Sequence, residues 1–192
     1  RILVTVNFDI IDYMCKISKF FMAKTWKDSD ISIDPIKDQT IAIIGYGIQG
    51  DAQANNLKDS GLKVIVGLKE GGSSWNKAVS DGHEVMSVVE ACKMADIIHI
   101  LIPDMVQSQV YKNEIEPNLS EGNALAFSHA AAIYWGWIKA PDNVDIIMVA
   151  PKGPGSKVRE TYLDGFGTPS IVAVEQDKTG TAWDRTLGIA KG

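Results

Sequence analysis

Three glycines in the first half of the chain have the spacing of a phosphate-binding turn. Gly45, Gly47 and Gly50 form a complete G-x-G-x-x-G run that directly follows the apolar stretch 40–44. In this context the first glycine permits a tight turn, the second lets the backbone approach a pyrophosphate, and the third lets a helix pack closely on the strand. The start of that helix offers unpaired N–H groups and a partial positive charge to phosphates. We therefore predict that residues 45–50 bind a dinucleotide.

A second segment, residues 66–74, indicates which nicotinamide dinucleotide is bound. An NAD-binding strand usually ends in Asp or Glu about 20 residues after the glycines, where the acid accepts hydrogen bonds from the ribose. Here the strand ends in Val-Gly-Leu-Lys, so the cation Lys69 stands near the place of the acid. Lys69, Ser73 and Ser74 together suit a 2′-phosphate, whereas the adjacent Glu70 has the opposite charge and leaves NADH as an alternative. The pattern favours NADPH.

Two further polar residues follow predicted strands. His129 comes after the strand 124–127 and Lys152 after the strand 144–149. In open α/β sheets ligands bind at the carboxyl ends of strands, so both side chains are candidates for catalysis. A histidine there can hold or transfer a proton near neutral pH, and a lysine can stabilise negative charge on substrate oxygens. The simpler alternatives are a histidine satisfied by a backbone carbonyl and a solvated lysine.

The cysteines and the other histidines form no metal-binding motif. Cys15 and Cys92 are too far apart for a Cys-x-x-Cys pair, and they fit reduced thiols in a cytoplasmic protein. His83 opens a short strand and His99 lies inside an apolar one, so we expect both to be structural. No stretch predicts a helix with paired carboxylates. We therefore expect no metal ligands in this chain.

Short apolar runs alternate with amphipathic stretches from residue 40 onward. The pattern predicts strands over residues 40–44, 64–66, 84–86, 96–102, 124–127, 144–149 and 170–174, and helices over 49–60, 73–81, 88–94, 105–115 and 179–190. Strands and helices that alternate at this spacing form a parallel sheet with helices on both faces. The predicted fold class is α/β, with a Rossmann-like, doubly wound and mostly parallel sheet.

Composition and charge exclude several kinds of partner. Hydrophobic residues make up 45% of the chain and charged residues 22%, as in an ordinary globular protein. The net charge is -5 without a basic cluster, which argues against a nucleic-acid partner. The apolar stretches in residues 1–21 are interrupted by charges and fall short of the roughly 20 residues that a membrane span needs. We expect residues 1–21 to be an extension and residues 22–192 to be the functional domain.

Several segments together resemble the ketol-acid reductoisomerases. The most specific is Met-Val-Ala-Pro-Lys-Gly-Pro-Gly over residues 148–155, and the glycine run and residues 66–75 and 101–119 also match. The motif and this resemblance together give the expected cofactor-binding residues: Gly45, Tyr46, Gly47, Ile48, Gln49, Gly50, Lys69, Ser73, Ser74, Leu101, Ile102, Pro103, Asp104, Met105, Val106, Gln107 and Gly155. The resemblance also implies that His129 is an active-site histidine and that Lys152 lines the substrate pocket.

The resemblance implies a function for the chain. Members of that family convert 2-acetolactate or 2-aceto-2-hydroxybutyrate, both small 2-hydroxy-keto acids, into dihydroxy acids during branched-chain amino acid synthesis. They use NADPH and two magnesium ions, whose ligands lie in a helical C-terminal domain that this chain lacks. We expect the chain to be the NADPH-binding N-terminal domain of such an enzyme, which would be cytoplasmic and homo-oligomeric at full length. Alone it is expected to bind cofactor without catalysing the reaction.

Two departures from the family pattern leave alternatives open. Ala130, Ala131 and Ala132 stand where the family usually has Gly-Phe-x, and Gly72 stands where a serine often supports the 2′-phosphate. One alternative is a stand-alone nucleotide-binding or regulatory relative without catalysis. The other is a metal-independent Rossmann dehydrogenase that uses His129 and Lys152 for simple reduction.

Overall fold

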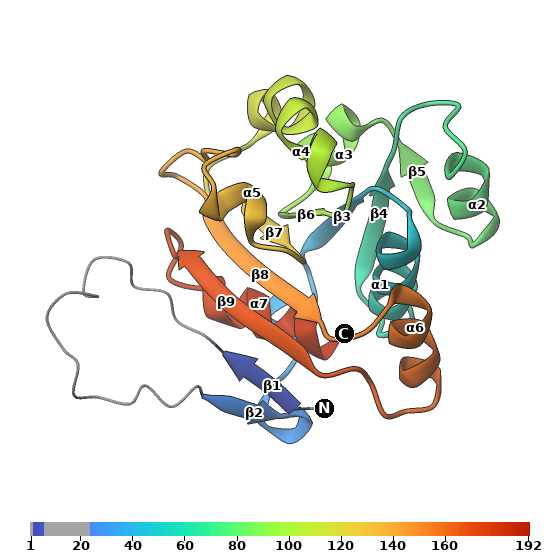
Figure 1. The fold of residues 1–192 in the computed structure, drawn as a ribbon, viewed down its shortest axis with the longest axis vertical. Helices are drawn as coiled ribbons and strands as arrows, with labels where there is room; N and C mark the ends of the chain where they lie inside the picture. Colours follow the sequence, from blue (N-terminus) through green and yellow to red (C-terminus); the bar gives the residue numbers. More distant parts are fainter. Residues whose placement is uncertain (1, 6–23) are drawn as a thin grey trace, which may run out of the picture.

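The computed structural model describes residues 2–5 and 24–192, whose arrangement is shown in Figure 1. Ile2–Thr5 forms strand β1, which pairs antiparallel with β2 (Thr25–Lys27) and parallel with β9 (Ser170–Gln176). The backbone of residues 2–5 therefore extends the sheet beyond β9. The rest of the extension that the sequence predicts over residues 1–21 lies outside the described residues.

The described strands form one nine-stranded sheet with the order β2-β1-β9-β8-β7-β6-β3-β4-β5. Its other strands are β3 (Thr40–Ile44), β4 (Lys63–Gly67), β5 (Glu84–Met86), β6 (Ile97–Ile100), β7 (Ala124–Phe127) and β8 (Asp145–Pro151). Neighbouring strands from β5 to β8 run parallel, whereas β9 runs antiparallel to β8. The predicted α/β fold with a doubly wound, mostly parallel sheet is confirmed.

Helices cover both faces of this sheet (Figure 1). They are α1 (Ile48–Asp59), α2 (Trp75–Ser80), α3 (Val88–Met94), α4 (Asp104–Val110), α5 (Ala131–Tyr134), α6 (Gly155–Leu163) and α7 (Ala182–Lys191). Successive residues of a strand point to opposite faces, so β3 contributes to two apolar clusters. Ile41 and Ile43 pack with α1 and α7, whereas Ala42 and Ile44 pack with α3 and α5.

The helices differ from the predicted ones in two places. The helix expected over residues 105–115 is α4 followed by a π-helical turn, Tyr111–Ile115. Helices α5 and α6 are additional to the prediction. The run that precedes α6, residues 151–155, is rich in glycine and proline and is typical of a turn. It nevertheless leads into a helix because Pro154, at the helix start, removes no intrahelical hydrogen bond.

The strand order reverses at β3, which creates a crevice. The chain leaves β3 through α1 and enters β4 on one side, while β6 lies on the other side of β3. The connections that follow β3 and β6 therefore diverge at their carboxyl ends, where doubly wound sheets bind ligands. Gly45 follows β3 and Leu101 follows β6, so the predicted glycine turn lies at this crevice.

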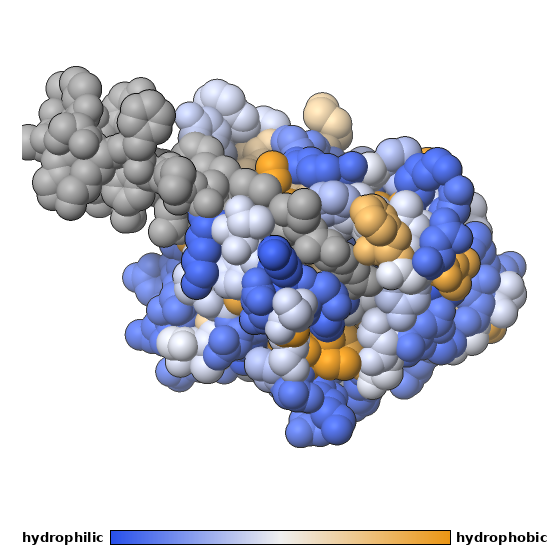
Figure 2. Space-filling view, turned by 90° about the horizontal axis from the view of Figure 1, so that it is seen from below, coloured by the Kyte–Doolittle hydropathy of each residue, from blue (hydrophilic) through white to orange (hydrophobic). Residues whose placement is uncertain are grey.

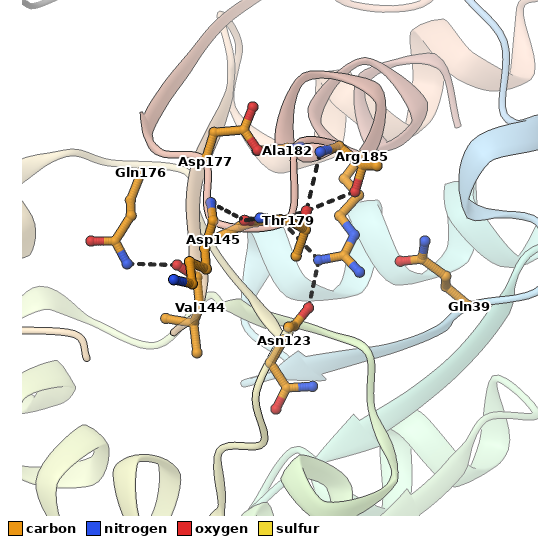
Figure 3. Close-up of polar contacts among 12 residues, drawn as sticks. Gln39, Asn123, Val144, Asp145, Gln176, Asp177, Thr179, Ala182 and Arg185 are labelled. Atoms are coloured by element: carbon orange, nitrogen blue, oxygen red, sulfur yellow. Dashed lines mark hydrogen bonds and ion pairs between the residues drawn. The ribbon is translucent and has the colours of Figure 1, made fainter. Parts of the chain in front are cut away.

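At the other end of the sheet, a buried carboxylate joins β8 to the connection between β9 and α7 (Figure 3). The Asp145 side chain is fully buried and accepts hydrogen bonds from the backbone N–H groups of Lys178 (2.8 Å) and Thr179 (3.0 Å). It also accepts one from the Thr179 hydroxyl at 2.7 Å, and it pairs with Arg185 of α7 at 2.9 Å. These contacts fix the start of β8 against the β9–α7 connection.

Five large apolar side chains are exposed on two neighbouring helices and the turn after them. They are Met105 and Val106 of α4, Tyr134 of α5, and Trp135 and Trp137 directly after α5. We call them the α4–α5 surface. By contrast, the face drawn in Figure 2, at the end of the molecule near β1 and β2, carries small separate hydrophobic patches among hydrophilic residues.

Candidate functional site

The glycine turn is closely packed at two of its three glycines. Gly45 has a φ of +100°, in the region that glycine adopts without strain. A Cβ atom at Gly45 would lie 2.7 Å from Cγ2 of Ile102, and one at Gly50 would lie 2.2 Å from the carbonyl oxygen of Gly45. Both distances are too short for a carbon atom. These two glycines therefore allow β3, α1 and the loop after β6 to pack together.

Gly47 is different because the fold itself does not require a glycine there. Its φ is -78°, and a Cβ atom at this position would meet no atom of residues 2–5 and 24–192 within 4 Å. Gly47 is the N-cap residue of α1, and no side chain among the described residues caps the N–H groups of the first turn. Free space thus lies directly over unpaired N–H groups at the positive end of a helix. This arrangement fits the diphosphate of a dinucleotide.

Replacing Gly50 or Gly47 by alanine is expected to change the stability of the chain by different amounts. Gly50→Ala is expected to lower the free energy of unfolding by about 1–3 kcal/mol or more, because the new methyl group collides with a backbone oxygen and displaces α1. Gly47→Ala is expected to stay within about 1 kcal/mol of the wild type, because its methyl group meets no atom. Urea unfolding of the purified variants measures both values. An equal loss of stability in the two variants would contradict the assigned roles.

A groove over the glycine turn is lined by many of the residues that the sequence predicts as cofactor-binding. These are Gly45, Tyr46, Gly47, Ile48, Gln49, Lys69, Ser73, Ser74, Leu101, Ile102 and Pro103, and the groove also includes Leu68, Gly72 and Trp75. Lys69 and Ser73 are exposed beyond the end of β4. Since the second strand of such a fold receives the adenosine ribose, a dinucleotide here would have its nicotinamide toward the ends of β6 and β7.

A second pocket continues the groove past the ends of β6 and β7. It shares Gln49, Leu101 and Ile102 with the groove, and its other lining residues are Ile100, Asp104, Gln107, Ser128, His129 and Pro151. Nδ1 of His129 lies 3.6 Å from a carboxylate oxygen of Asp104 and accepts a hydrogen bond from the N–H of Ala131 at 3.2 Å. The neutral imidazole therefore carries its proton on Nε2. We call this the β6–β7 pocket.

Two of the predicted site residues are buried glycines that line neither the groove nor the β6–β7 pocket. Gly50 packs against the turn, and a Cβ atom at Gly155 would lie 2.1 Å from the carbonyl oxygen of Ile48. Gly155 therefore brings the start of α6 into contact with the start of α1. Its expected contact with the cofactor stays a prediction.

Three exposed residues of the predicted site also line neither the groove nor the β6–β7 pocket. Met105 and Val106 belong to the α4–α5 surface, and Met105 is 90% exposed. Lys152 directly follows β8, and its backbone N–H donates to the carbonyl oxygen of Pro169. Its side chain is exposed near the β6–β7 pocket, which includes the preceding residue, Pro151. The substrate contact expected of Lys152 stays a prediction.

The Tyr46 side chain ties the glycine turn to α2. Its hydroxyl donates to Asp81 at 2.8 Å and accepts from Asn55 at 3.0 Å. Burial, and then the bond to Asp81, raise the pKa of Tyr46, so the phenol stays protonated. Lys77 of α2 bridges Asp81 (2.7 Å) and Asp51 of α1 (2.9 Å), and the bond to Asp81 is the main cause of its raised pKa. These contacts hold the segment 69–74 between two fixed elements.

Sequence reasoning missed two polar residues close to the β6–β7 pocket, Gln53 and Ser128. Gln53 is buried on α1, and Ser128 lines the pocket and bonds both Gln53 and the buried His99. His99 is uncharged at neutral pH because burial lowers its pKa to about 4. One signal was available: Gln49, Gln53 and Asn56 recur at the helical positions where α1 should bury apolar residues.

Two kinds of feature are absent from the described residues. No group of three or more His, Cys, Asp or Glu side chains among them could hold a metal ion. None of the described helices is long and apolar enough to span a membrane. The described residues therefore do not fit a magnesium centre, although they fit a dinucleotide.

The strand order, the glycine turn and the groove define a dinucleotide-binding Rossmann domain. Residues 35–192 match the family described as acetohydroxy acid isomeroreductase, NADPH-binding domain, and this match covers most of the chain. The chain belongs to that family.

Named relatives agree with this assignment. The chain is 82% identical over 170 residues to a ketol-acid reductoisomerase (NADP(+)) of Nitrosopumilus maritimus, which covers 88% of the chain and 51% of the relative. It is 60% identical over 171 residues to the enzyme of the same name from Methanocaldococcus jannaschii, which covers 89% of the chain and 52% of the relative. The chain thus spans about half the length of the curated relatives that it matches.

Solved structures show the same fold. An NADH-preferring ketol-acid reductoisomerase from an uncultured archean superposes with a TM-score of 0.83 at 48% identity, over 85% of this chain and 51% of that one. An NAD-binding semialdehyde dehydrogenase from Cupriavidus necator superposes with a TM-score of 0.65 at 22% identity, over 80% of this chain and 59% of that one. The second similarity concerns the fold alone.

Proposed function

We propose that this chain is the cofactor-binding half of a ketol-acid reductoisomerase and that it binds NADPH in preference to NADH. The observation that carries the proposal is the free space over Gly47 at the uncapped start of α1, in a groove that continues to Lys69. Family membership supports the same cofactor.

The preference for NADPH is the finer part of the proposal. Two of the relatives carry NADP(+) in their names, whereas the superposed structure is titled NADH-preferring. The segment 69–74 favours the phosphorylated cofactor, because Lys69, Ser73 and Ser74 offer one cation and two hydroxyl groups at the groove. Glu70 is exposed next to them and opposes a phosphate.

Each half of the site has a distinct task in the proposed reaction. NADPH, when bound, supplies a hydride. The start of α1 would hold the diphosphate of NADPH. The β6–β7 pocket would receive the nicotinamide ring together with a 2-hydroxy-keto acid such as 2-acetolactate or 2-aceto-2-hydroxybutyrate. His129 would hold a proton at Nε2 near the substrate, while its Nδ1 accepts from the N–H of Ala131. Lys152 would stabilise negative charge on substrate oxygens.

The proposed full reaction yields 2,3-dihydroxy acids for branched-chain amino acid synthesis, and it needs parts that lie outside the described residues. Magnesium ligands would come from the rest of the protein. We also propose that the whole enzyme is a cytoplasmic homo-oligomer that binds neither nucleic acid nor membranes. The net charge of -5 supports the exclusion of nucleic acid.

Titration of the purified chain with NADPH and NADH at matched salt tests the proposal. We expect NADPH to bind more tightly, and we expect Gly47→Val to abolish binding of both cofactors without loss of fold by circular dichroism. The valine side chain would fill the space over the helix start. If the wild-type chain binds neither cofactor, the proposed function is wrong. If it binds NADH more tightly, only the assigned preference fails.

A further inference from the structure

A partly buried polar network lies between α1 and the carboxyl ends of three strands. It consists of Gln49 and Gln53 of α1, His99 of β6, and Ser128 directly after β7. Gln49 donates to the carbonyl oxygen of Gly153 at 3.1 Å, and Gln53 donates to Oε1 of Gln49 at 3.0 Å and to the Ser128 hydroxyl at 3.2 Å. The Ser128 hydroxyl donates to the carbonyl oxygen of Val149 at 2.8 Å and lies 3.3 Å from Nε2 of His99.

The hydrogen atoms in this network can be assigned without ambiguity. A serine hydroxyl has one hydrogen and two lone pairs. Since the Ser128 hydrogen goes to Val149, both lone pairs must accept, one from Gln53 and one from His99. His99 therefore carries its hydrogen on Nε2. All the bonding capacity of the Ser128 hydroxyl is used within the protein, so it has none left for a ligand.

The network adds side-chain links at the end of the sheet where the backbone hydrogen bonds between β7 and β8 stop. The β7–β8 ladder ends at the pair Phe127 and Met148, and the Ser128 hydroxyl adds the next link by bonding Val149. Gln49 then ties α1 to Gly153, which lies between Lys152 and α6. The network thus fixes the two segments that carry His129 and Lys152 relative to the helix that holds the diphosphate.

We propose that Ser128 and Gln53 are positioning residues that set the nicotinamide end of the cofactor site. Ser128 holds the segment of His129, and Gln53 joins it to Gln49 at the junction of the groove and the β6–β7 pocket. Neither residue reacts. The inference rests on the proposed function, since it assumes that the nicotinamide binds in the β6–β7 pocket.

The test compares two ligands on the whole 192-residue chain. NADPH occupies both ends of the site, whereas 2′-phospho-ADP-ribose lacks the nicotinamide and probes only the adenosine and diphosphate end. Ser128→Ala and Gln53→Met each remove hydrogen bonds of the network. We expect both to weaken NADPH about tenfold, the effect of one net hydrogen bond, and to leave 2′-phospho-ADP-ribose within about twofold. Ser128→Thr keeps the hydroxyl and is expected to restore NADPH binding.

A matched control separates positioning from loss of stability. Thr186 is fully buried in α7, and its hydroxyl donates to the carbonyl oxygen of Ala182, away from the groove. Thr186→Val should lower the thermal midpoint without changing the ratio of the two affinities.

The remaining outcomes overturn the inference in distinguishable ways. If Ser128→Ala and Gln53→Met bound NADPH as tightly as the wild type, these residues would have a structural role only. The same conclusion would follow if the variants lost affinity for NADPH and for 2′-phospho-ADP-ribose equally. If the wild type bound 2′-phospho-ADP-ribose as tightly as NADPH, the second pocket would not hold the nicotinamide, although the chain would still bind dinucleotides. If the wild type bound neither ligand, the proposed function itself would fail.

Discussion

Replacing Lys69 by alanine is expected to weaken NADPH binding by about 10- to 100-fold, the cost of losing one charge-assisted hydrogen bond to a phosphate. NADH has no 2′-phosphate, so its affinity should not change. Lys69 is exposed in the groove, and Gly72, which also lines the groove, offers no side chain to compensate. Isothermal titration with both cofactors at two salt concentrations measures the effect, which should be smaller at high salt.

The neighbouring acid provides a control of opposite sign for Lys69. Glu70 is also exposed, and Glu70→Ala removes a negative charge from the same segment. It should strengthen NADPH binding by about two- to fivefold, as expected for one solvent-exposed charge. If Lys69→Ala lowered the affinities for NADH and NADPH equally, Lys69 would support the shape of the groove and would not bind the 2′-phosphate. The preference for NADPH would then have to come from other residues.

Asp145→Ala is expected to lower the free energy of unfolding by about 3–5 kcal/mol, because it leaves the largely buried Arg185 charge without its carboxylate partner. Two backbone N–H groups and the Thr179 hydroxyl would also lose their acceptor. The start of β8 and the β9–α7 connection would then separate. Guanidinium unfolding followed by tryptophan fluorescence measures the change.

A nearby acid serves as the control for this prediction. Asp142 is exposed three residues earlier, so Asp142→Ala should change the free energy of unfolding by less than about 0.5 kcal/mol. Cofactor affinity of folded Asp145→Ala should stay close to that of the wild type, since the site lies at the other end of the sheet. A loss of less than 1 kcal/mol, the ordinary cost of one hydrogen bond, would mean that the Asp145 contacts contribute little.

The fold could be predicted largely from local patterns. The strand Thr40–Ile44 is apolar and β-branched, and Gly45 follows it directly, so its place in the sheet is specified by neighbours in sequence. Helix α6 was harder to predict, because Pro154 and Gly155 are typical of a turn and the helix depends on packing against α1. The strand expected over residues 96–102 is shorter, since Leu101 and Ile102 turn into the crevice.

The site was only partly predictable for a related reason. The glycine turn and Lys69 could be found because their roles follow from the motif and its distance to the second strand. Gln53 and Ser128 could not, since the contact between them joins positions 75 residues apart. The spacing of polar residues on α1 was a visible signal, but it did not identify their partners.

The contact between α6 and α1 has a consequence for how the chain folds. Gln49 bonds Gly153 across 104 residues, and Gly155 packs against Ile48 beside it. Closing such a long loop lowers the conformational entropy of the chain before stabilising contacts have formed. Contacts between residues so far apart in sequence therefore form slowly. The first βα unit can fold locally, yet its helix start reaches its final surroundings only after β8 and α6 are in place. During refolding, cofactor binding should therefore develop after most of the helical circular dichroism signal has returned.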